Sequence, residues 1–270
     1  MILVDGLVSE ALSALDRGLA YGDGVYRTMR AESGRVLHWP RHHRKLEHDC
    51  ARLGIACLAA PVLSADIARI LRAEPDCVLK IIVTRGQGGR GFAPPMHTEP
   101  TRVVASFPLP PPPQDCDEHG VRVRWCSTRL AAQPALAGVK HLNRLENVLA
   151  RSEWTDPTIA EGIMLDAGGD VVEGTMSNVF ILEQGRLITP ALERCGVAGV
   201  QRERLIALAE RICRGCEVGS VSPQRLLAAD QVYLLNSVIG AWWVSALEAR
   251  TWKRSELTPV LQSALRADDG

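Results

Sequence analysis

The spacing of apolar and polar positions predicts short strands alternating with amphipathic helices. Alternating or continuous apolar runs of four to eight residues favour strands, and apolar residues three and four apart favour helices. Because strands and helices both occur before residue 107, we predict a small α+β domain there. Its expected strands are 1–5, 24–31, 34–38, 77–84 and 101–107, and its expected helices are 40–53 and 64–73.

The second half of the chain shows the same two periodicities in a longer series. A double glycine, Gly168-Gly169, separates two apolar runs and predicts a hairpin between them. The expected strands are 121–127, 161–166, 170–174, 178–182 and 231–235, and the expected helices are 141–154, 200–213 and 222–228.

A run of prolines separates these two parts of the chain, between Phe107 and Gln114. Proline lacks the N–H that a sheet or helix requires and favours extended backbone. We therefore predict a domain over residues 1–107, a linker over 108–114 and a larger domain over 115–270. No internal repeat of solenoid or propeller length occurs.

The charges of the chain balance, with 31 basic and 31 acidic side chains. Without a broad positive field, we expect neither nucleic acid nor an anionic membrane surface as a partner. The N-terminal residues lack the basic and apolar pattern of a leader, and no apolar stretch approaches the ~20 residues of a membrane span. We expect a cytoplasmic protein.

Eight cysteines at irregular spacings indicate reduced thiols rather than a disulfide framework. Cys213 and Cys216 form a CxxC pair, but this pair closes an apolar helical stretch and has no second ligand pair in the sequence. We expect neither a redox centre nor a metal site here.

Lysine is scarce, and this limits the residues that could form a Schiff base. Only Lys45, Lys80, Lys140 and Lys253 occur. Lys80 lies in an apolar strand, and Lys45 and Lys253 lie beside other charges. Lys140 follows a loop with Pro134 and Gly138 and is expected to open a helix, although its spacing alone is more typical of an ordinary surface lysine. The apolar stripe expected on that helix consists of Leu142, Leu145, Val148 and Leu149.

The string Lys140-His-Leu-Asn-Arg-Leu-Glu-Asn147 closely resembles the Schiff-base motif of the 4-amino-4-deoxychorismate lyases. Further matching motifs follow in that family's order, so the resemblance covers nearly the full chain. It implies a two-domain, α+β, fold type IV enzyme that binds pyridoxal 5'-phosphate, with a small α/β domain, a larger pseudo-barrel domain and a homodimeric assembly. The other motifs are Arg17–Gly24, Arg85–Gly91, Glu173–Asn178, Gly196–Arg202 and Asn236-Ser237.

The resemblance also implies roles for individual residues. Lys140 would bind the cofactor covalently, and Glu173 would keep its ring nitrogen protonated. Without the resemblance, Glu173 would be interpreted as a solvent-exposed glutamate, and residues 196–201 as the start of an ordinary helix. The phosphate would meet the amides of Val200 and Gln201 and the side chain of Arg44, with Asn178, Asn236 and Ser237 as further cofactor-binding residues.

Alternation along Val25–Arg30 places Tyr26, Thr28 and Arg30 on one face of a strand. The resemblance implies that this face lines the substrate pocket; the alternative is an edge strand whose arginines lie in water. Arg90 is a further candidate for substrate binding. Its loop lacks the Lys-Ser/Thr ending of a nucleotide-binding loop, so we expect a mobile active-site loop.

The implied reaction converts 4-amino-4-deoxychorismate into 4-aminobenzoate and pyruvate, a step toward folate. Two alternatives stay open: an aminotransferase of the same fold acting on branched-chain or D-amino acids, and a non-catalytic cofactor-binding or interaction protein. The chain also departs from the family pattern. Tyr26-Arg27 stands where phenylalanine-glutamate is expected, and Trp243 stands where proline is expected.

Overall fold

The computed structural model describes residues 1–113 and 115–267. The chain forms two compact units, unit 1 with Met1–Pro110 and Val139–Asn143, and unit 2 with Pro111–Gly138 and Arg144–Gly270. Unit 1 therefore includes Lys140, which we expected in the second domain. The boundaries drawn at residues 107 and 115 stay predictions.

Unit 1 is built on an antiparallel sheet whose two long central strands are β3 (Gly24–Glu32) and β5 (Cys77–Thr84). These strands pair without interruption from Gly24 opposite Thr84 to Ala31 opposite Cys77. The register fixes which side chains of the two strands share a face. The full order is β2 (Leu7–Val8), β1 (Ile2–Val4), β6 (Arg102–Phe107), β5, β3 and β4 (Arg35–Val36).

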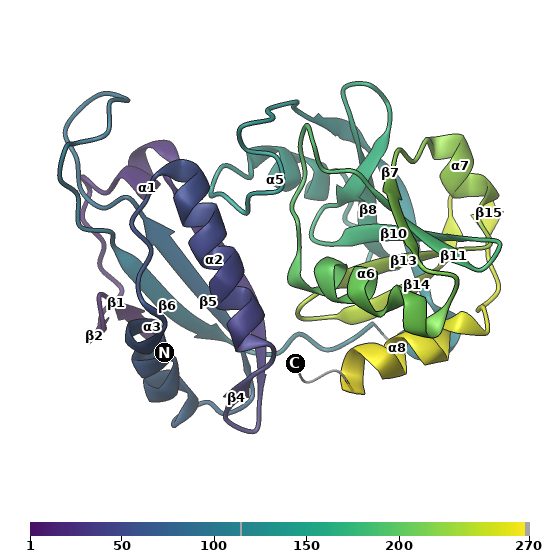
Figure 1. Cartoon of the computed structure of the whole chain (residues 1–270), viewed down its shortest axis with the longest axis horizontal. Helices are drawn as coiled ribbons and strands as arrows, with labels where there is room; N and C mark the ends of the chain where they lie inside the picture. The colour runs from purple at the N-terminus through teal and green to yellow at the C-terminus, as the bar shows by residue number, and fades with distance from the viewer. Residues whose placement is uncertain (114, 268–270) are drawn as a thin grey trace. The chain divides into compact units, whose positions relative to one another are not determined.

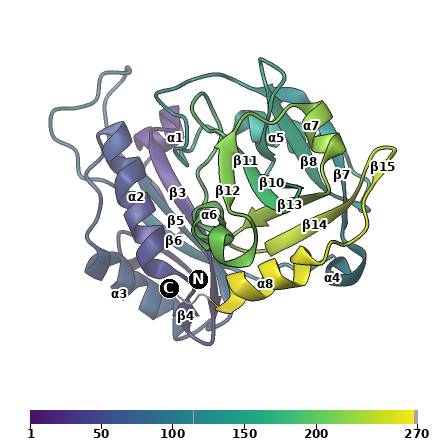
Figure 2. The same cartoon turned by 45° about the vertical axis from the view of Figure 1, so that its right-hand side comes forward.

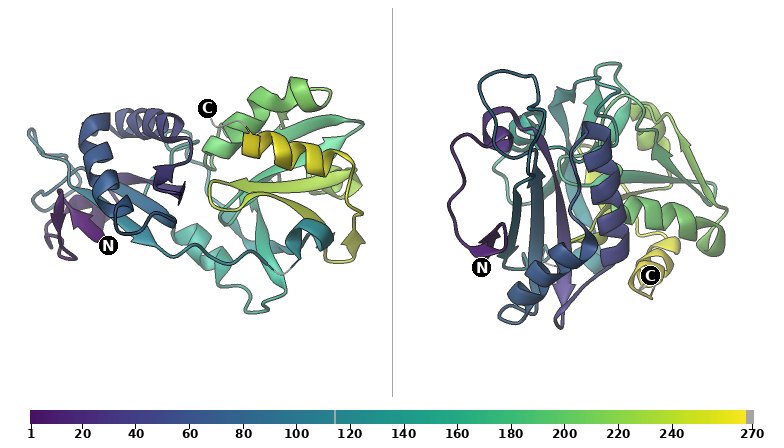
Figure 3. Two further views of the ribbon diagram at one scale, coloured as in Figure 1. Left: turned by 90° about the horizontal axis from the view of Figure 1, so that it is seen from below. Right: turned by 60° about the vertical axis from the view of Figure 1, so that its left-hand side comes forward.

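Two helices, α2 (Trp39–Leu53) and α3 (Ala60–Leu71), lie over one face of this sheet (Figures 1 and 3). Both begin with a proline in the first turn, where a missing N–H is tolerated. Helix α2 ends at Gly54, whose φ of 62° is the left-handed conformation that stops a helix. Apolar side chains of both helices and of the sheet form one core, including Leu46, Leu63 and Leu79.

Unit 2 is a closed barrel with additional strands at its edges (Figure 2). The barrel strands follow one another by hydrogen bonding, and closure comes where β9 pairs with β10, with Glu173 opposite Asn178. In order around the barrel they are β10 (Asn178–Glu183), β13 (Gln231–Asn236), β14 (Gly240–Leu247), β7 (Val121–Leu130), β8 (Ile159–Asp166) and β9 (Val171–Gly174). Outside this ring lie β11 (Arg186–Pro190), β12 (Cys216–Gly219) and β15 (Arg250–Thr251).

The barrel strands contribute side chains to three separate apolar clusters, two of which lie on opposite faces of β10 and β13. One core includes Ile163, Ile181 and Leu234. The opposite face of β10 and β13 packs with helices α6 (Val200–Ile212) and α8 (Leu257–Ala267), which Figure 2 shows beside these strands. The side chains in this contact include Phe180 and Tyr233. The shorter helices of the chain are α1 (Arg17–Tyr21), α4 (Cys116–His119), α5 (Leu145–Arg151) and α7 (Pro223–Ala228).

The helix predicted over 141–154 is wrong at its start, because α5 begins only at Leu145. The preceding residues, Lys140 among them, lie outside the helix and form backbone hydrogen bonds with β3 instead. The expected apolar stripe also fails to face a core: Leu145, Val148 and Leu149 are 76%, 60% and 59% exposed. Tertiary pairing has overridden the local helical pattern here.

Trp243, the residue found where proline was expected, is a buried side chain of β14 in the core beside α6 and α8. Its indole Nε1 donates to the Asp117 carbonyl at 3.2 Å. Trp243 therefore contributes to the packing between the outside of the barrel and these two helices. Cys213 closes α6 as expected, and all eight cysteines are free thiols. Over the described residues, no helix has both the length and the apolar character needed to cross a membrane.

Candidate active site

Lys140 is fixed in unit 1 by hydrogen bonds on both sides of its peptide backbone. The Tyr26 N–H donates to the Lys140 carbonyl at 3.0 Å, and the Lys140 N–H donates to Asp49 Oδ2 at 3.0 Å. The Leu142 N–H donates to the Gly24 carbonyl at 3.0 Å, which continues the pairing with β3. Lys140 is thus held by β3 and by a side chain of α2.

The Lys140 ammonium lies over the aromatic ring of Tyr26, with Nζ 4.4 Å from the ring centroid. Lys80 Nζ lies 5.2 Å from the same centroid. The register places Lys80 directly opposite Thr28, so both lysines and the predicted Tyr26–Thr28 face come together. The aromatic face attracts both cations. Lys80 was not predicted as a site residue. The pairing register of β3 and β5, which places Lys80 opposite Thr28, is the feature from which it could have been predicted.

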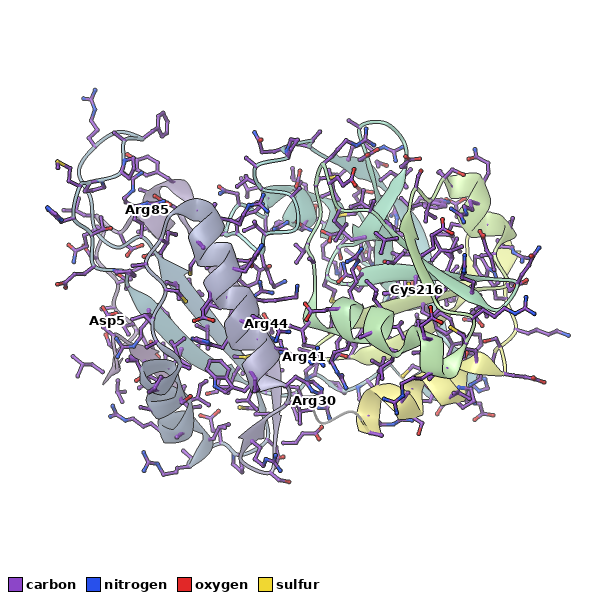
Figure 4. The ribbon with its side chains drawn as sticks, viewed as in Figure 1. Asp5, Arg30, Arg41, Arg44, Arg85 and Cys216 are labelled. Carbon is purple, nitrogen blue, oxygen red and sulfur yellow. The ribbon has the colours of Figure 1, made fainter. Side chains whose placement is uncertain are left out.

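The arginines predicted to bind anions differ in their surroundings. Arg30 is half-buried on β3, and its Nε donates to Glu32 Oε1 at 2.5 Å. Arg44 is exposed on α2, one turn after Arg41 (Figure 4). Arg90 is exposed in the glycine-rich loop. Their proposed contacts with phosphate and substrate stay predictions.

The loop that carries Arg90 is anchored by Arg17. The Arg17 guanidinium donates to the carbonyls of Gly91 at 3.0 Å and Phe92 at 2.9 Å, and its Nε donates to Asp23 at 2.8 Å. The Gly91 N–H donates to the Tyr21 hydroxyl at 3.0 Å. These contacts hold the loop residues that directly follow Arg90.

Glu173 is buried in unit 2, at the position where the barrel closes. Its Oε2 accepts the Val197 N–H at 2.7 Å. The neighbouring Asn178 holds the same loop, because its Nδ2 donates to the Val197 carbonyl at 2.7 Å and its Oδ1 accepts the Gly199 N–H at 3.1 Å. Glu173 and Asn178 thus fix the loop that leads into α6.

The start of α6 is suited to bind an anion. Among the described residues no side chain caps the helix at Gly199, so the N–H groups of Val200 and Gln201 stand at its positive end. A β-carbon at Gly199 would lie 2.4 Å from Asn178 Oδ1, so a larger residue would displace the side chain that accepts the Gly199 N–H. A buried carboxylate and an uncapped helix start in one unit fit a phosphorylated cofactor with a basic ring nitrogen.

Asn236 and Ser237 lie where β13 turns toward β14. The Asn236 Oδ1 accepts the N–H groups of Val238 at 2.8 Å and Ile239 at 2.9 Å, and its Nδ2 donates to the Met176 carbonyl at 3.1 Å. Ser237 is half-buried. The contacts of Asn236 make it a turn-forming residue that also holds the loop after Glu173.

Glu161 is a buried carboxylate that sequence analysis missed. Its Oε1 accepts the Gly162 N–H, the Thr175 N–H and the Thr175 hydroxyl, and its Oε2 accepts the Met176 N–H and the Ser177 hydroxyl. Burial raises the pKa of Glu161, and the hydrogen bonds from these donors oppose that rise. Glu161 therefore shapes the loop between Glu173 and Asn178.

The chain belongs to the amino-transferase class IV family, whose model matches residues 24–247. It is 33% identical to an aminodeoxychorismate lyase of Vibrio harveyi over 92% of both chains. A crystal structure of the 4-amino-4-deoxychorismate lyase of Pseudomonas aeruginosa matches with a TM-score of 0.95 and 46% identity over 99% of both chains. A putative branched-chain-amino-acid aminotransferase of Methanocaldococcus jannaschii is 32% identical, over 83% of this chain and 78% of that protein. The predicted fold type IV architecture is confirmed.

The hydrogen bonds of Glu161 predict that Glu161→Leu lowers the free energy of unfolding by about 3–5 kcal/mol, because buried N–H and hydroxyl groups lose their acceptor. Urea unfolding measures the loss. Glu183→Leu is the matched control, since Glu183 pairs with Arg225 near the surface and should cost about 1 kcal/mol or less. Equal losses in both variants would contradict the role assigned to Glu161.

Proposed function

We propose that this chain is a pyridoxal-phosphate-dependent lyase that converts 4-amino-4-deoxychorismate into 4-aminobenzoate and pyruvate. The observation that carries the proposal is the position of the Lys140 amine over Tyr26, on the face of β3 that also bears Thr28 and Arg30. A lysine with a fixed backbone and an amine on a partly buried face suits covalent attachment of an aldehyde. The names of the Vibrio harveyi and Pseudomonas aeruginosa relatives support the same reaction.

Each part of the cofactor would be held by a different group of this chain. Lys140 would take the aldehyde, and Glu173 would pair with the ring nitrogen. The N–H groups of Val200 and Gln201 would bind the phosphate, with Arg44 as the cation, while Asn178 keeps the loop before α6 in place. Asn236 and Ser237 would complete the cofactor contacts. When bound, pyridoxal phosphate supplies an electron sink for the bond-breaking step.

The residues of this chain would then manage protons and charge. Lys140, released when the substrate amine takes its place, would remove the proton from the amine-bearing ring carbon. After the enolpyruvyl group leaves, the same ammonium would return a proton to the enolpyruvate carbon. Glu173 would keep the ring nitrogen protonated throughout, because a nearby carboxylate favours the protonated form.

The substrate carries two carboxylates, and the β3 face offers cations for them. Arg30 lies on that face, and Lys80 lies opposite Thr28. Tyr26 would pack against the ring of the substrate, and Arg90 would contribute from the glycine-rich loop. Local cations of this kind are needed, because a chain of zero net charge has no broad positive field to attract a substrate with two carboxylates.

An aminotransferase of branched-chain or D-amino acids is the second candidate, favoured by the relative from Methanocaldococcus jannaschii. Its chemistry would use the same Lys140 and Glu173. The string from Lys140 to Asn147 and the Asn236-Ser237 pair favour the lyase, because an aminotransferase is expected to carry small residues at the latter position.

We also infer that the enzyme acts in the cytoplasm, in a step toward folate, as a homodimer. Eight free thiols suit a reducing compartment. The apolar residues Leu145, Val148 and Leu149 of α5 are exposed, and Met176 is 50% exposed. A face of this kind is typical of a surface that another subunit covers, and a second copy of the chain is the occupant that the family resemblance implies.

The first prediction from the proposed function concerns the cofactor-binding lysine. Lys140→Ala should lose the near-visible absorbance of bound pyridoxal phosphate and the mass increase after borohydride reduction, because the covalent link is gone. Absorbance spectra and peptide mass mapping measure both. Lys253→Ala is the control, since Lys253 is exposed and distant in sequence from every proposed site residue. Unchanged, reducible absorbance in Lys140→Ala would exclude Lys140.

The second prediction separates the lyase from the aminotransferase. An aminotransferase passes the amino group to its cofactor and needs a keto acid before each further turnover, whereas a lyase does not. We expect repeated turnover of 4-amino-4-deoxychorismate without keto acid, with equal yields of 4-aminobenzoate and pyruvate measured by chromatography. A single turnover that resumes only on addition of a keto acid would establish the aminotransferase.

The third prediction concerns the apolar face of α5. Val148→Glu places a charge on this face and should shift the protein from dimer to monomer in analytical ultracentrifugation, since an unpaired charge is costly in an interface. Val218→Glu is the control, because Val218 is 50% exposed on β12, a strand that pairs with β11, whereas α5 packs against β7 and β8. A wild-type monomer, or a dimer that both variants leave intact, would refute the interface.

A further inference from the structure

An arginine lies in the core of unit 1. Arg27 occupies the face of β3 that packs under α2, between the fully buried side chains of Val25 and Met29, and is itself only 3% exposed. Its guanidinium forms an ion pair with Asp49 of α2, which is 2% exposed, and donates to the Lys45 carbonyl at 3.1 Å. Both charges are therefore buried.

Stability alone is a weak reason for such a pair. Removing two charges from water costs about as much free energy as their attraction provides. Apolar residues of similar size therefore commonly stabilise a core as well or better. Burial lowers the pKa of the Arg27 guanidinium, and the charge of Asp49 opposes this. Arg27 Nε also has no hydrogen-bond partner within the described part of the chain. The pair is thus a costly arrangement for packing.

Asp49 has a second contact that apolar residues could not provide. The oxygen that accepts the Arg27 guanidinium, Oδ2, also accepts the backbone N–H of Lys140 at 3.0 Å. The carbonyl of Lys140 is taken by the Tyr26 N–H, so Asp49 is the acceptor for the opposite edge of the same peptide segment. Its other oxygen, Oδ1, lies 3.3 Å from Nδ1 of His48, which is at the surface.

We propose that Asp49 is a positioning residue for Lys140, and that Arg27 holds the Asp49 carboxylate where it can accept the Lys140 N–H. This inference rests on the proposed role of Lys140. The carboxylate of Asp49 fixes the edge of the Lys140 segment that faces away from β3, and with it the position from which the amine extends over the Tyr26 ring. Arg27 is present to neutralise and orient that carboxylate.

Two double variants separate positioning from packing. Arg27→Met/Asp49→Asn removes both charges but keeps an oxygen that can accept the Lys140 N–H. Arg27→Met/Asp49→Leu removes both charges and the acceptor, with a side chain of similar size. The two proteins differ only in whether position 49 can bind the Lys140 N–H, so a difference between them reports this hydrogen bond.

Three readouts test the proposal. With pyridoxal phosphate added to the cofactor-free protein, the Asn double variant should attach the cofactor at a rate within about threefold of wild type, and the Leu double variant about tenfold more slowly, as expected for a lost hydrogen bond. The pH midpoint of the bound-cofactor absorbance should move only in the Leu double variant. Hydrogen exchange at the Lys140 amide should be faster in that variant.

Equal attachment rates and equal pH midpoints in the two variants would overturn the proposal and leave Arg27–Asp49 a packing element. Arg27→Met/Asp49→Ala replaces the Leu variant if that protein does not fold. If both acceptor-free proteins fail to fold while the Asn variant folds, the role is structural and the proposal is also overturned. Failure of the proposed function gives a different result, since wild type then fails to attach cofactor at Lys140, while amide exchange still tests the hydrogen bond.

Discussion

The pairing of residues 139–143 with the start of β3 is the constraint on which the candidate site depends. It joins a segment more than a hundred residues away in sequence to the sheet of unit 1, with Val25 opposite His141. Without it, Lys140 would lie on a flexible connection before α5. With it, the lysine backbone is fixed at both edges, and only the side-chain torsions determine where the amine lies over Tyr26.

In unit 2 the comparable constraint is a pair of buried carboxylates around the closure of the barrel. Glu161 fixes the loop after Glu173 through its hydrogen bonds, and Glu173 fixes the loop before α6 through the Val197 N–H. A buried carboxylate that accepts several N–H groups holds a loop in one conformation. Any rearrangement of the loop would break these hydrogen bonds and leave the carboxylate without partners in a low-dielectric interior. Irregular backbone is thereby kept as rigid as the strands beside it.

The features predicted correctly from the sequence are those that depend on residues nearby in the chain. The alternation of β3, the stop of α2 at Gly54 and the end of α6 near Cys213 depend on neighbours a few residues away. The predictions were wrong or incomplete where contacts with residues distant in the sequence determine the structure. The pairing with β3 prevents Lys140 from opening a helix, and the apolar positions of α5 face outward. Glu161 could not be recognised because its donors become neighbours only when β8 and β9 have paired.

The choice between lyase and aminotransferase depends on features that the fold does not determine. Both chemistries need a fixed lysine, a carboxylate for the ring nitrogen and an anion site at a helix start, and we propose Lys140, Glu173 and the start of α6 for these three roles. The difference arises after the proton on the amine-bearing carbon is removed: a substrate with a leaving group on the adjacent carbon loses it, and a substrate without one must be reprotonated elsewhere. We propose that specificity depends on whether the face of Tyr26, Thr28 and Lys80 selects a substrate with two carboxylates. The site for two carboxylates that we propose on this face would favour the lyase reaction, because it would admit the substrate that carries the leaving group.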